Sequence, residues 1–192
     1  VRLAVINVGE FTERCYQLAP GDDVYLRGPH GVPVTPPADA HIVCVAGGTG
    51  LAAVYQIAED FGSAEQPADL FVGARTANRL YFRDECDAVG RVTLATDDGS
   101  AGFHGRVSDA LDAFLAEQSP DALANMVFYN CGPAPMIHAS EAVQKRYVPA
   151  DRICSAIDYL TKCGVGICGA CASPDGRRIC VDGPFITSEP AA

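Results

Sequence analysis

The chain has 192 residues, 48% of them hydrophobic, which is enough for one large domain or a medium domain with a small one and for a core that needs no disulfides. Its formal charge of −10 and its pI of about 4.7 argue against nucleic acid and against an anionic membrane surface as partners. The sequence opens without the basic region and cleavage site of a secretory signal peptide, so we expect a cytoplasmic protein whose nine cysteines meet a reducing environment.

The first 35 residues are typical of short strands joined by turns. Apolar and polar side chains alternate over residues 2–8, and a turn at 20–23 leads into a second predicted strand at 23–28. Proline and glycine interrupt any regular structure over residues 28–37. We therefore expect a small β unit followed by a linker.

From His41 onwards, strands and helices alternate. The continuous apolar run around GGTG is interrupted by turn residues, so it indicates strand, loop and helix, and not a membrane span. The predicted strands cover residues 41–46, 69–74, 91–96, 126–131 and 153–158. The predicted helices cover residues 51–61, 79–89, 106–118 and 135–147, with Ser108 as the N-cap of the third unless that helix begins slightly earlier. This order predicts an α/β fold with a doubly wound parallel sheet, whose ligand lies at the carboxyl ends of the strands.

A glycine-rich loop lies where the first of these strands becomes a helix. It consists of Gly47, Gly48, Thr49 and Gly50. Backbone N–H groups at a helix N-terminus attract phosphate, and glycine lets the phosphate approach closely. Taken alone, the loop is equally typical of a tight structural turn.

A second loop, TDDG, follows the strand at 91–96. Its Asp97 and Asp98 carry carboxylates that can bind ribose hydroxyls and repel a 2′-phosphate. We therefore expect the site to prefer NAD over NADP, although a solvated turn would also contain such residues.

A third loop follows the strand at 126–131. It contains Cys131, Gly132, Pro133 and Met136. A free thiol at such a strand end could contact a ring bound in the crevice. Arg75 and Glu85, near other predicted strand ends, are further candidates for lining the crevice.

Four cysteines near the C-terminus follow the spacing C-x4-C-x2-C-x8-C. They are Cys163, Cys168, Cys171 and Cys180. The first three spacings match the plant-type [2Fe–2S] pattern, and the intervening glycines let the loop wrap around a small inorganic core. Structural zinc more often uses two C-x2-C pairs separated by a spacer, and disulfides are rare in a reducing compartment. An iron–sulfur cluster is thus favoured, with zinc and disulfides as alternatives.

Four motifs together resemble the electron-transfer subunits of type B dihydroorotate dehydrogenases, which are flavoproteins of the ferredoxin–NADP reductase-like family. The motifs read VAGGTGLAAV, ATDDGSAGFHG, YNCGPAPM and KCGVGICGACASPDGRRICVDGPF. The resemblance implies the last part of a flavin-binding β-barrel at residues 1–37, an NAD-binding domain at 38–158 and a [2Fe–2S] domain at 159–192.

The resemblance also implies FAD contacts in the first of these parts. Gly9 and Thr12 match the segment that touches the FAD pyrophosphate, and Gly28, Pro29 and Gly31 match a GPxG turn. The earlier barrel strands of the family and its Arg-x-Tyr-Ser motif are not in this sequence. FAD is therefore implied by the family and not by a complete flavin motif of this chain.

The implied function is electron transfer in pyrimidine biosynthesis. In this family, electrons pass between NAD(H), FAD and a [2Fe–2S] cluster, and then to or from a dihydroorotate dehydrogenase catalytic subunit in a heterotetramer. The small subunits of NAD-linked hydrogenases and of ferredoxin–NAD(P) transhydrogenases share these modules and are an alternative. A non-catalytic nucleotide-binding module with a structural zinc tail is a second alternative.

Overall fold

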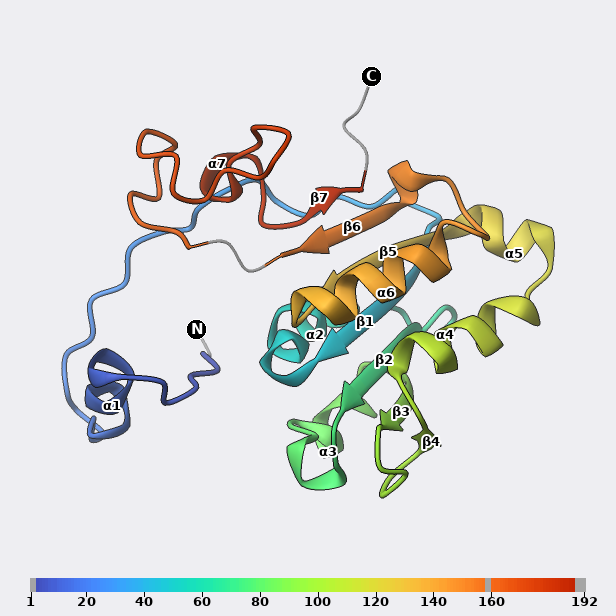
Figure 1. Cartoon of the computed structure of the whole chain (residues 1–192), viewed down its shortest axis with the longest axis horizontal. Helices are drawn as coiled ribbons and strands as arrows, with labels where there is room; N and C mark the ends of the chain where they lie inside the picture. Colours follow the sequence, from blue (N-terminus) through green and yellow to red (C-terminus); the bar gives the residue numbers. More distant parts are fainter. Residues whose placement is uncertain (1–2, 158–159, 189–192) are drawn as a thin grey trace.

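The core of the protein is a seven-stranded sheet, seen in a computed structural model that describes residues 3–157 and 160–188 (Figure 1). The strand order is β4-β3-β2-β1-β5-β6-β7, and every neighbouring pair is parallel except β6 and β7. The strands are β1 (His41–Gly47), β2 (Ala68–Ala74), β3 (Gly90–Thr96), β4 (Phe103–His104), β5 (Met126–Cys131), β6 (Ile153–Ala156) and β7 (Ile186–Thr187). The predicted α/β class and parallel sheet are confirmed.

Three longer helices cover the two faces of this sheet. They are α2 (Leu51–Phe61), α4 (Val107–Ala116) and α6 (Ala134–Gln144). Alternate residues of β1 serve the two faces: Ile42 and Cys44 pack in the cluster that contains residues of α2, and Val43 packs in the cluster that contains residues of α4. A strand buried on both faces must be apolar throughout, which explains the continuous run in the sequence.

Several short elements complete the fold. They are the helices α1 (Glu10–Tyr16), α3 (Arg83–Cys86), α5 (Pro120–Asn125) and α7 (Ile179–Asp182), and 3₁₀ turns at Gly48–Gly50, Ala77–Arg79 and Ala150–Arg152. Helix α4 begins at Val107 with Arg106 as its N-cap, so Ser108 lies buried in the first turn and is not the cap. No helix among the described residues is long and apolar enough to cross a bilayer.

The strands predicted at 2–8 and 23–28 are wrong for the described part of this segment. Residues 3–40 contain helix α1 and extended or turn backbone, but no strand. A strand needs a neighbour for its N–H and C=O groups, and no other described segment runs alongside these residues as a partner strand. Figure 1 shows α1 lying away from the sheet, with the following chain running back towards the C-terminal loops.

The C-terminal segment does not hang free of the sheet. After the cysteine-rich loops and α7, the chain returns to form β7 at the edge of the sheet, next to β6. Strand β6 ends at Ala156, two residues earlier than predicted, and the boundary predicted between residues 158 and 159 falls outside the described residues.

Candidate functional site

A cavity of about 1010 Å³ opens at the carboxyl ends of β1, β2 and β3. It is lined by loop residues after these strands, by the first turn of α4, by α6 and by one residue of the N-terminal segment. The lining residues are Ile6, Gly47, Gly48, Thr49, Gly73, Ala74, Arg75, Thr76, Asn78, Arg79, Tyr81, Asp97, Arg106, Val107, Ser108, Pro133, Pro135, Met136 and Ala139. The place is the one at which open α/β sheets bind ligands.

The glycine loop enters the cavity through three of its four predicted residues. Gly48 has a φ of +57°, in the left-handed region that glycine adopts without strain. Gly50 does not line the cavity, and it packs instead against the loop after β5: a Cβ atom on it would lie 2.2 Å from the carbonyl oxygen of Cys131. The two loops therefore touch through their backbones, which brings the predicted glycine motifs together.

In the loop after β5, too, only some of the predicted residues line the cavity. Pro133 and Met136 line the cavity, whereas Cys131 and Gly132 are not among its lining residues. A Cβ atom on Gly132 would lie 2.9 Å from the backbone nitrogen of Gly47, so this glycine also allows the close contact between loops.

The two aspartates after β3 have different roles. Asp97 lines the cavity, and Asp98 does not. The carboxylate of Asp98 accepts hydrogen bonds from the side chain of Ser100 at 2.6 Å and from its backbone N–H at 3.0 Å, and these bonds lower the pKa of Asp98. Asp98 thus stabilises the turn, and Asp97 remains available to a ligand.

Three guanidinium groups line the same cavity. Arg75, which the sequence suggested, is joined by Arg79 from the turn after β2 and by Arg106 from the N-cap of α4. Glu85 is not among the lining residues. Sequence reasoning missed Arg79 and Arg106 because neither belongs to a glycine motif; the signal that could have found them is that each is the first residue of a predicted helix that follows a strand of the sheet.

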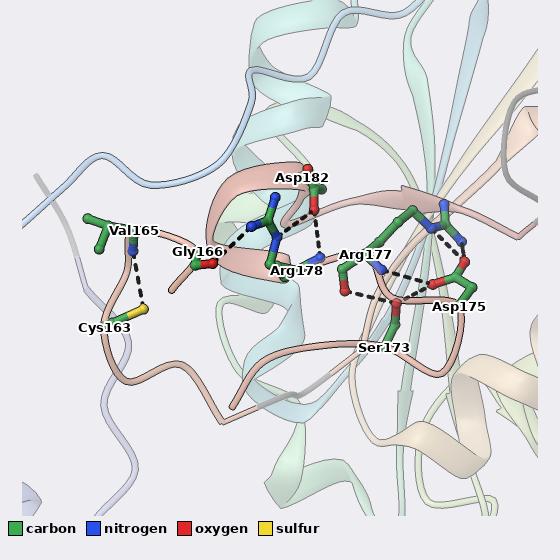
Figure 2. Close-up of polar contacts among 8 residues, drawn as sticks. All are labelled: Cys163, Val165, Gly166, Ser173, Asp175, Arg177, Arg178 and Asp182. Atoms are coloured by element: carbon green, nitrogen blue, oxygen red, sulfur yellow. Dashed lines mark hydrogen bonds and ion pairs between the residues drawn. The ribbon is translucent and has the colours of Figure 1, made fainter. Parts of the chain in front are cut away.

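The four C-terminal cysteines associate as two pairs. The side chain of Cys168 is among the groups that lower the pKa of Cys163, and the side chains of Cys171 and Cys180 act on each other's pKa in the same way, so each sulfur lies near its pair partner. Backbone N–H groups also face the sulfurs: that of Val165 lies 3.5 Å from the Cys163 Sγ (Figure 2). Hydrogen bonds from the backbone of Val165, Cys168 and Ile167 lower the pKa of Cys163 to about 6, which favours the thiolate that binds metals.

Two sets of polar contacts hold the shape of this cysteine loop (Figure 2). The Nη1 of Arg178 donates to the carbonyl of Gly166 at 2.8 Å, and the backbone N–H of Arg178 donates to Asp182 Oδ2 at 2.7 Å. Asp175 accepts a hydrogen bond from the Nε of Arg177 at 2.7 Å. The thiol pairs are therefore held by a loop with its own ion pairs.

The paired arrangement fits a binuclear cluster better than a single metal ion. In a [2Fe–2S] centre with four cysteine ligands, each iron takes two thiolates. Cys171 and Cys180 are buried and Cys168 is exposed, so one side of the site faces solvent.

The residues matched to FAD lie in two places. Gly9 precedes α1, and the hydroxyl of Thr12 accepts hydrogen bonds from the backbone N–H groups of Val8 and Gly9 at 2.9 and 3.0 Å. Gly28, Pro29 and Gly31 lie in the segment after α1, and Gly31 packs against the C-terminal loops, where a Cβ atom on it would lie 1.9 Å from the carbonyl oxygen of Gly183.

The fit to FAD rests on exposed apolar side chains along this segment. Val8 and Phe11 are 81% and 80% exposed, and Tyr25 is 94% exposed. The dimethylbenzene part of an isoalloxazine ring is flat and apolar, and such side chains can cover it. Ile6 of the same segment reaches the large cavity, so the segment adjoins the dinucleotide site.

Two family models match the chain. Residues 44–142 match the oxidoreductase NAD-binding domain, and residues 160–190 match the iron–sulfur cluster binding domain of dihydroorotate dehydrogenase B. The first match contains every residue that lines the cavity except Ile6, and the second contains all four paired cysteines.

The chain is also similar to curated proteins and to a solved structure. It is 36% identical to the probable dihydroorotate dehydrogenase B (NAD(+)) electron transfer subunit of Methanopyrus kandleri and 34% identical to that of Methanocaldococcus jannaschii, covering 97% and 95% of this chain and 69% and 68% of those proteins. A solved NADH-dependent reduced ferredoxin–NADP oxidoreductase, described in work on flavin-based electron bifurcation, has a TM-score of 0.80 and 29% identity over 95% of this chain and 65% of its own. This chain thus spans about two thirds of each relative's length. With a paired-thiol loop, a dinucleotide cavity and this identity over nearly its whole length, the chain belongs to the family of dihydroorotate dehydrogenase B electron transfer subunits.

Proposed function

We propose that this chain transfers electrons between NAD(H) and the catalytic subunit of a dihydroorotate dehydrogenase. One observation supports this proposal above all: the dinucleotide cavity and the loop with two thiol pairs belong to the same sheet. The loop leaves the sheet after β6 and returns to it as β7.

On the dinucleotide side, different residues of the cavity bind different parts of NAD(H). The N–H groups at the start of α2 face the pyrophosphate of NAD(H), and the carboxylate of Asp97 accepts hydrogen bonds from a ribose hydroxyl. Arg75 and Arg106 neutralise phosphate charge in the same cavity. These residues bind and orient the nicotinamide towards the N-terminal segment at Ile6.

On the cluster side, Cys163 and Cys168 would hold one iron of a [2Fe–2S] cluster, and Cys171 and Cys180 the other. The N-terminal segment, including Gly9, Thr12 and Gly28, would contact FAD. When bound, the flavin and the cluster convert the two-electron chemistry of NAD(H) into single-electron transfers. The protein positions these groups and excludes water from the buried thiol pair.

The catalytic subunit would dock over the exposed apolar side chains of the cysteine loop. Leu160, Val165 and Ile167 are 66%, 58% and 82% exposed, and they flank Cys163 and Cys168. Clustered exposed apolar side chains mark interaction sites, and electron transfer requires the partner to approach the cluster closely. A heterotetramer of two such pairs is the assembly that the family suggests.

The experiment that tests this function begins with anaerobic purification of the chain with its catalytic subunit. Iron, sulfide, zinc and flavin are assayed on one sample together with its visible spectrum. We expect about two irons per chain and, on adding NADH, bleaching of the cluster absorbance with reduction of orotate by the complex. A colourless sample containing zinc would overturn the proposal.

A second candidate function is favoured by the similarity to the NADH-dependent reduced ferredoxin–NADP oxidoreductase, with its TM-score of 0.80. In that case, electrons would pass between NAD(H) and a subunit that handles NADPH and reduced ferredoxin. Offering the complex dihydroorotate in one assay and reduced ferredoxin with NADP⁺ in another separates the two, because only the correct donor reduces the cluster.

A cytoplasmic location accompanies this function. The nine cysteines, all within the described residues, form no disulfide. A reducing compartment keeps such thiols available for metal binding and contains the NAD(H) pool. Fractionation of the source cells with an antibody against the chain would test this location.

A further inference from the structure

One arginine of the N-terminal segment contacts the cysteine loop directly. The Nη2 of Arg27 donates to the backbone carbonyl of Cys163 and to that of Lys162, the latter at 3.3 Å. Residues 27 and 163 are 136 positions apart in the sequence. Arg27 immediately precedes the turn at Gly28, which the resemblance assigns to the flavin side.

The contact is close because the loop has no side chain at the point of approach. Gly164 has a φ of +72°, and a Cβ atom on it would lie 2.6 Å from the Cε1 of His30 and 2.8 Å from the Nη2 of Arg27. Further along the same segment, the backbone N–H of Val32 donates to the carbonyl of Gly183 at 2.7 Å. Residues 27–32 therefore touch both the start and the end of the cysteine loop.

A second arginine holds the same loop from within. Arg178 donates to the carbonyl of Gly166 at 2.8 Å. Its guanidinium lies 3.5 Å from the carboxylate of Asp182, which offsets its charge. In the part of the chain that the structure describes, Arg27 has no carboxylate partner, so its positive charge beside Cys163 is not offset.

We infer that Arg27 is a positioning residue for the iron–sulfur site: it ties the loop that carries the Cys163–Cys168 pair to the flavin-side segment and supplies an uncompensated positive charge next to that pair. The inference rests on the proposed function and deepens it. One-electron reduction adds a negative charge to the site, and a nearby cation stabilises that added charge. Arg27 thus acts on both the position of the loop and the ease of its reduction, without being a metal ligand.

The test compares Arg27→Gln and Arg27→Lys with two matched variants. Arg14→Gln removes another exposed arginine of the N-terminal segment, which pairs with Glu10 and makes no contact with the loop. Arg178→Gln removes the internal contact whose charge is already offset. Each protein, purified anaerobically with its catalytic subunit, is titrated with dithionite and redox mediators while the cluster is followed by electron paramagnetic resonance, and iron release to a chelator is timed.

We expect Arg27→Gln to shift the midpoint potential of the cluster to a more negative value and to speed iron release about 10-fold, the lower end of the usual effect of residues that support metal ligands. Arg27→Lys should recover most of the potential, because the charge remains, but not the slow iron release, because the shorter lysine side chain does not bring its nitrogen to the position from which Nη2 of Arg27 donates to both carbonyls. Arg14→Gln should match the wild type, and Arg178→Gln should speed iron release with a smaller shift in potential than Arg27→Gln.

A wild-type potential and wild-type iron release in Arg27→Gln would overturn the inference. So would a shift of equal size in Arg14→Gln, because the effect would then reflect net charge alone. The titration uses neither NADH nor dihydroorotate, so the inference can fail while electron transfer to the catalytic subunit stands. A wild-type chain without a cluster would overturn both.

Discussion

At the scale of single residues, neighbouring side chains of the same type serve different purposes. Asp97 and Asp98 are adjacent, yet only Asp97 lines the cavity, while Asp98 is held by Ser100. The cavity also contains the three guanidinium groups described above. A carboxylate among several cations is expected to discriminate between ligands that differ by one phosphate.

The first prediction concerns this carboxylate. Asp97→Asn should weaken the binding of NAD⁺ slightly and strengthen that of NADP⁺, changing their affinity ratio about 10-fold, or about 1.4 kcal/mol. The reason is that a 2′-phosphate is no longer repelled, while the guanidinium groups remain to bind it. Isothermal titration calorimetry of the complex with each nucleotide measures the ratio.

Asp98→Asn is the matched control for this prediction. It neutralises an adjacent carboxylate of the same loop that does not line the cavity, and it should leave the ratio nearly unchanged. An equal change in both variants would mean that the loop acts through its overall charge, and no change in either would show that the ribose lies elsewhere.

At the scale of elements, the amino ends of three strands are joined by one buried carboxylate. Asp69 of β2 accepts two hydrogen bonds from Arg91 of β3, both at 2.8 Å, and lies 2.6 Å from the Nε2 of His41 of β1. This cluster lies at the opposite end of the strands from the cavity. It therefore affects the register of the sheet and not the binding of the nucleotide.

The second prediction follows from the pKa of Asp69. Burial by itself would raise this pKa, but the hydrogen bonds and charges of Arg91 and His41 outweigh burial and lower it. A lowered pKa in the folded state contributes stability above the ordinary carboxyl pKa of about 3.9 and loses it as the pH falls through the folded value. Asp69→Asn should lower the free energy of unfolding by about 1.5–3 kcal/mol at pH 7.

Urea unfolding at a series of pH values checks this prediction. The difference between the wild type and Asp69→Asn should begin to shrink below about pH 4, where the carboxyl of the unfolded chain becomes protonated, and should disappear as the pH falls through the lowered pKa of the folded state. Nucleotide affinity at pH 7 should be unchanged. A stability difference that is constant down to pH 2 would contradict the assigned origin of the effect.

At the scale of the whole molecule, the cysteine loop is anchored to the sheet at both of its ends. It leaves after β6, and it returns through Phe185 and β7. The ring of Phe185 packs edge-on against Tyr129 of β5, with the ring centroids 5.5 Å apart, and the backbone N–H of Ser188 donates to Ile153 at 2.9 Å. The loop is thus part of the same folding unit as the strands next to it.

The third prediction tests this anchor. Phe185→Ala should lower the free energy of unfolding by about 2–3 kcal/mol, because it removes a partly buried ring from the core and an aromatic pair. Phe103→Ala in the short strand β4, where the ring is 40% exposed, is the control and should cost less. Denaturation followed by circular dichroism compares the two, and an equal or smaller loss in Phe185→Ala would show that the C-terminal segment folds apart from the sheet.

Much of this molecule could be predicted from local sequence patterns. Strands β1, β2, β3 and β5 and helix α2 lie within one residue of their predicted bounds, because each is a long apolar or amphipathic run. The short strands β4 and β7 were missed, since two-residue strands exist only through their neighbours. The strands predicted in the N-terminal segment were wrong for a related reason: the alternating pattern is present, but no strand among the described residues pairs with this segment.

The sequence by itself determined the chemistry of this protein: the glycine loops, the Asp97–Asp98 pair and the spacing of the four cysteines are local, and each has a physical reason that needs no structure. Only the tertiary structure decided which of these residues meet. In the folded chain, Asp97 lines the cavity and Asp98 does not, and Arg79 and Arg106 line the same cavity. The cysteines lie in two pairs, and Arg27 contacts the carbonyl of Cys163. Contacts over 136 residues depend on how the whole chain packs, and a local pattern cannot carry that information.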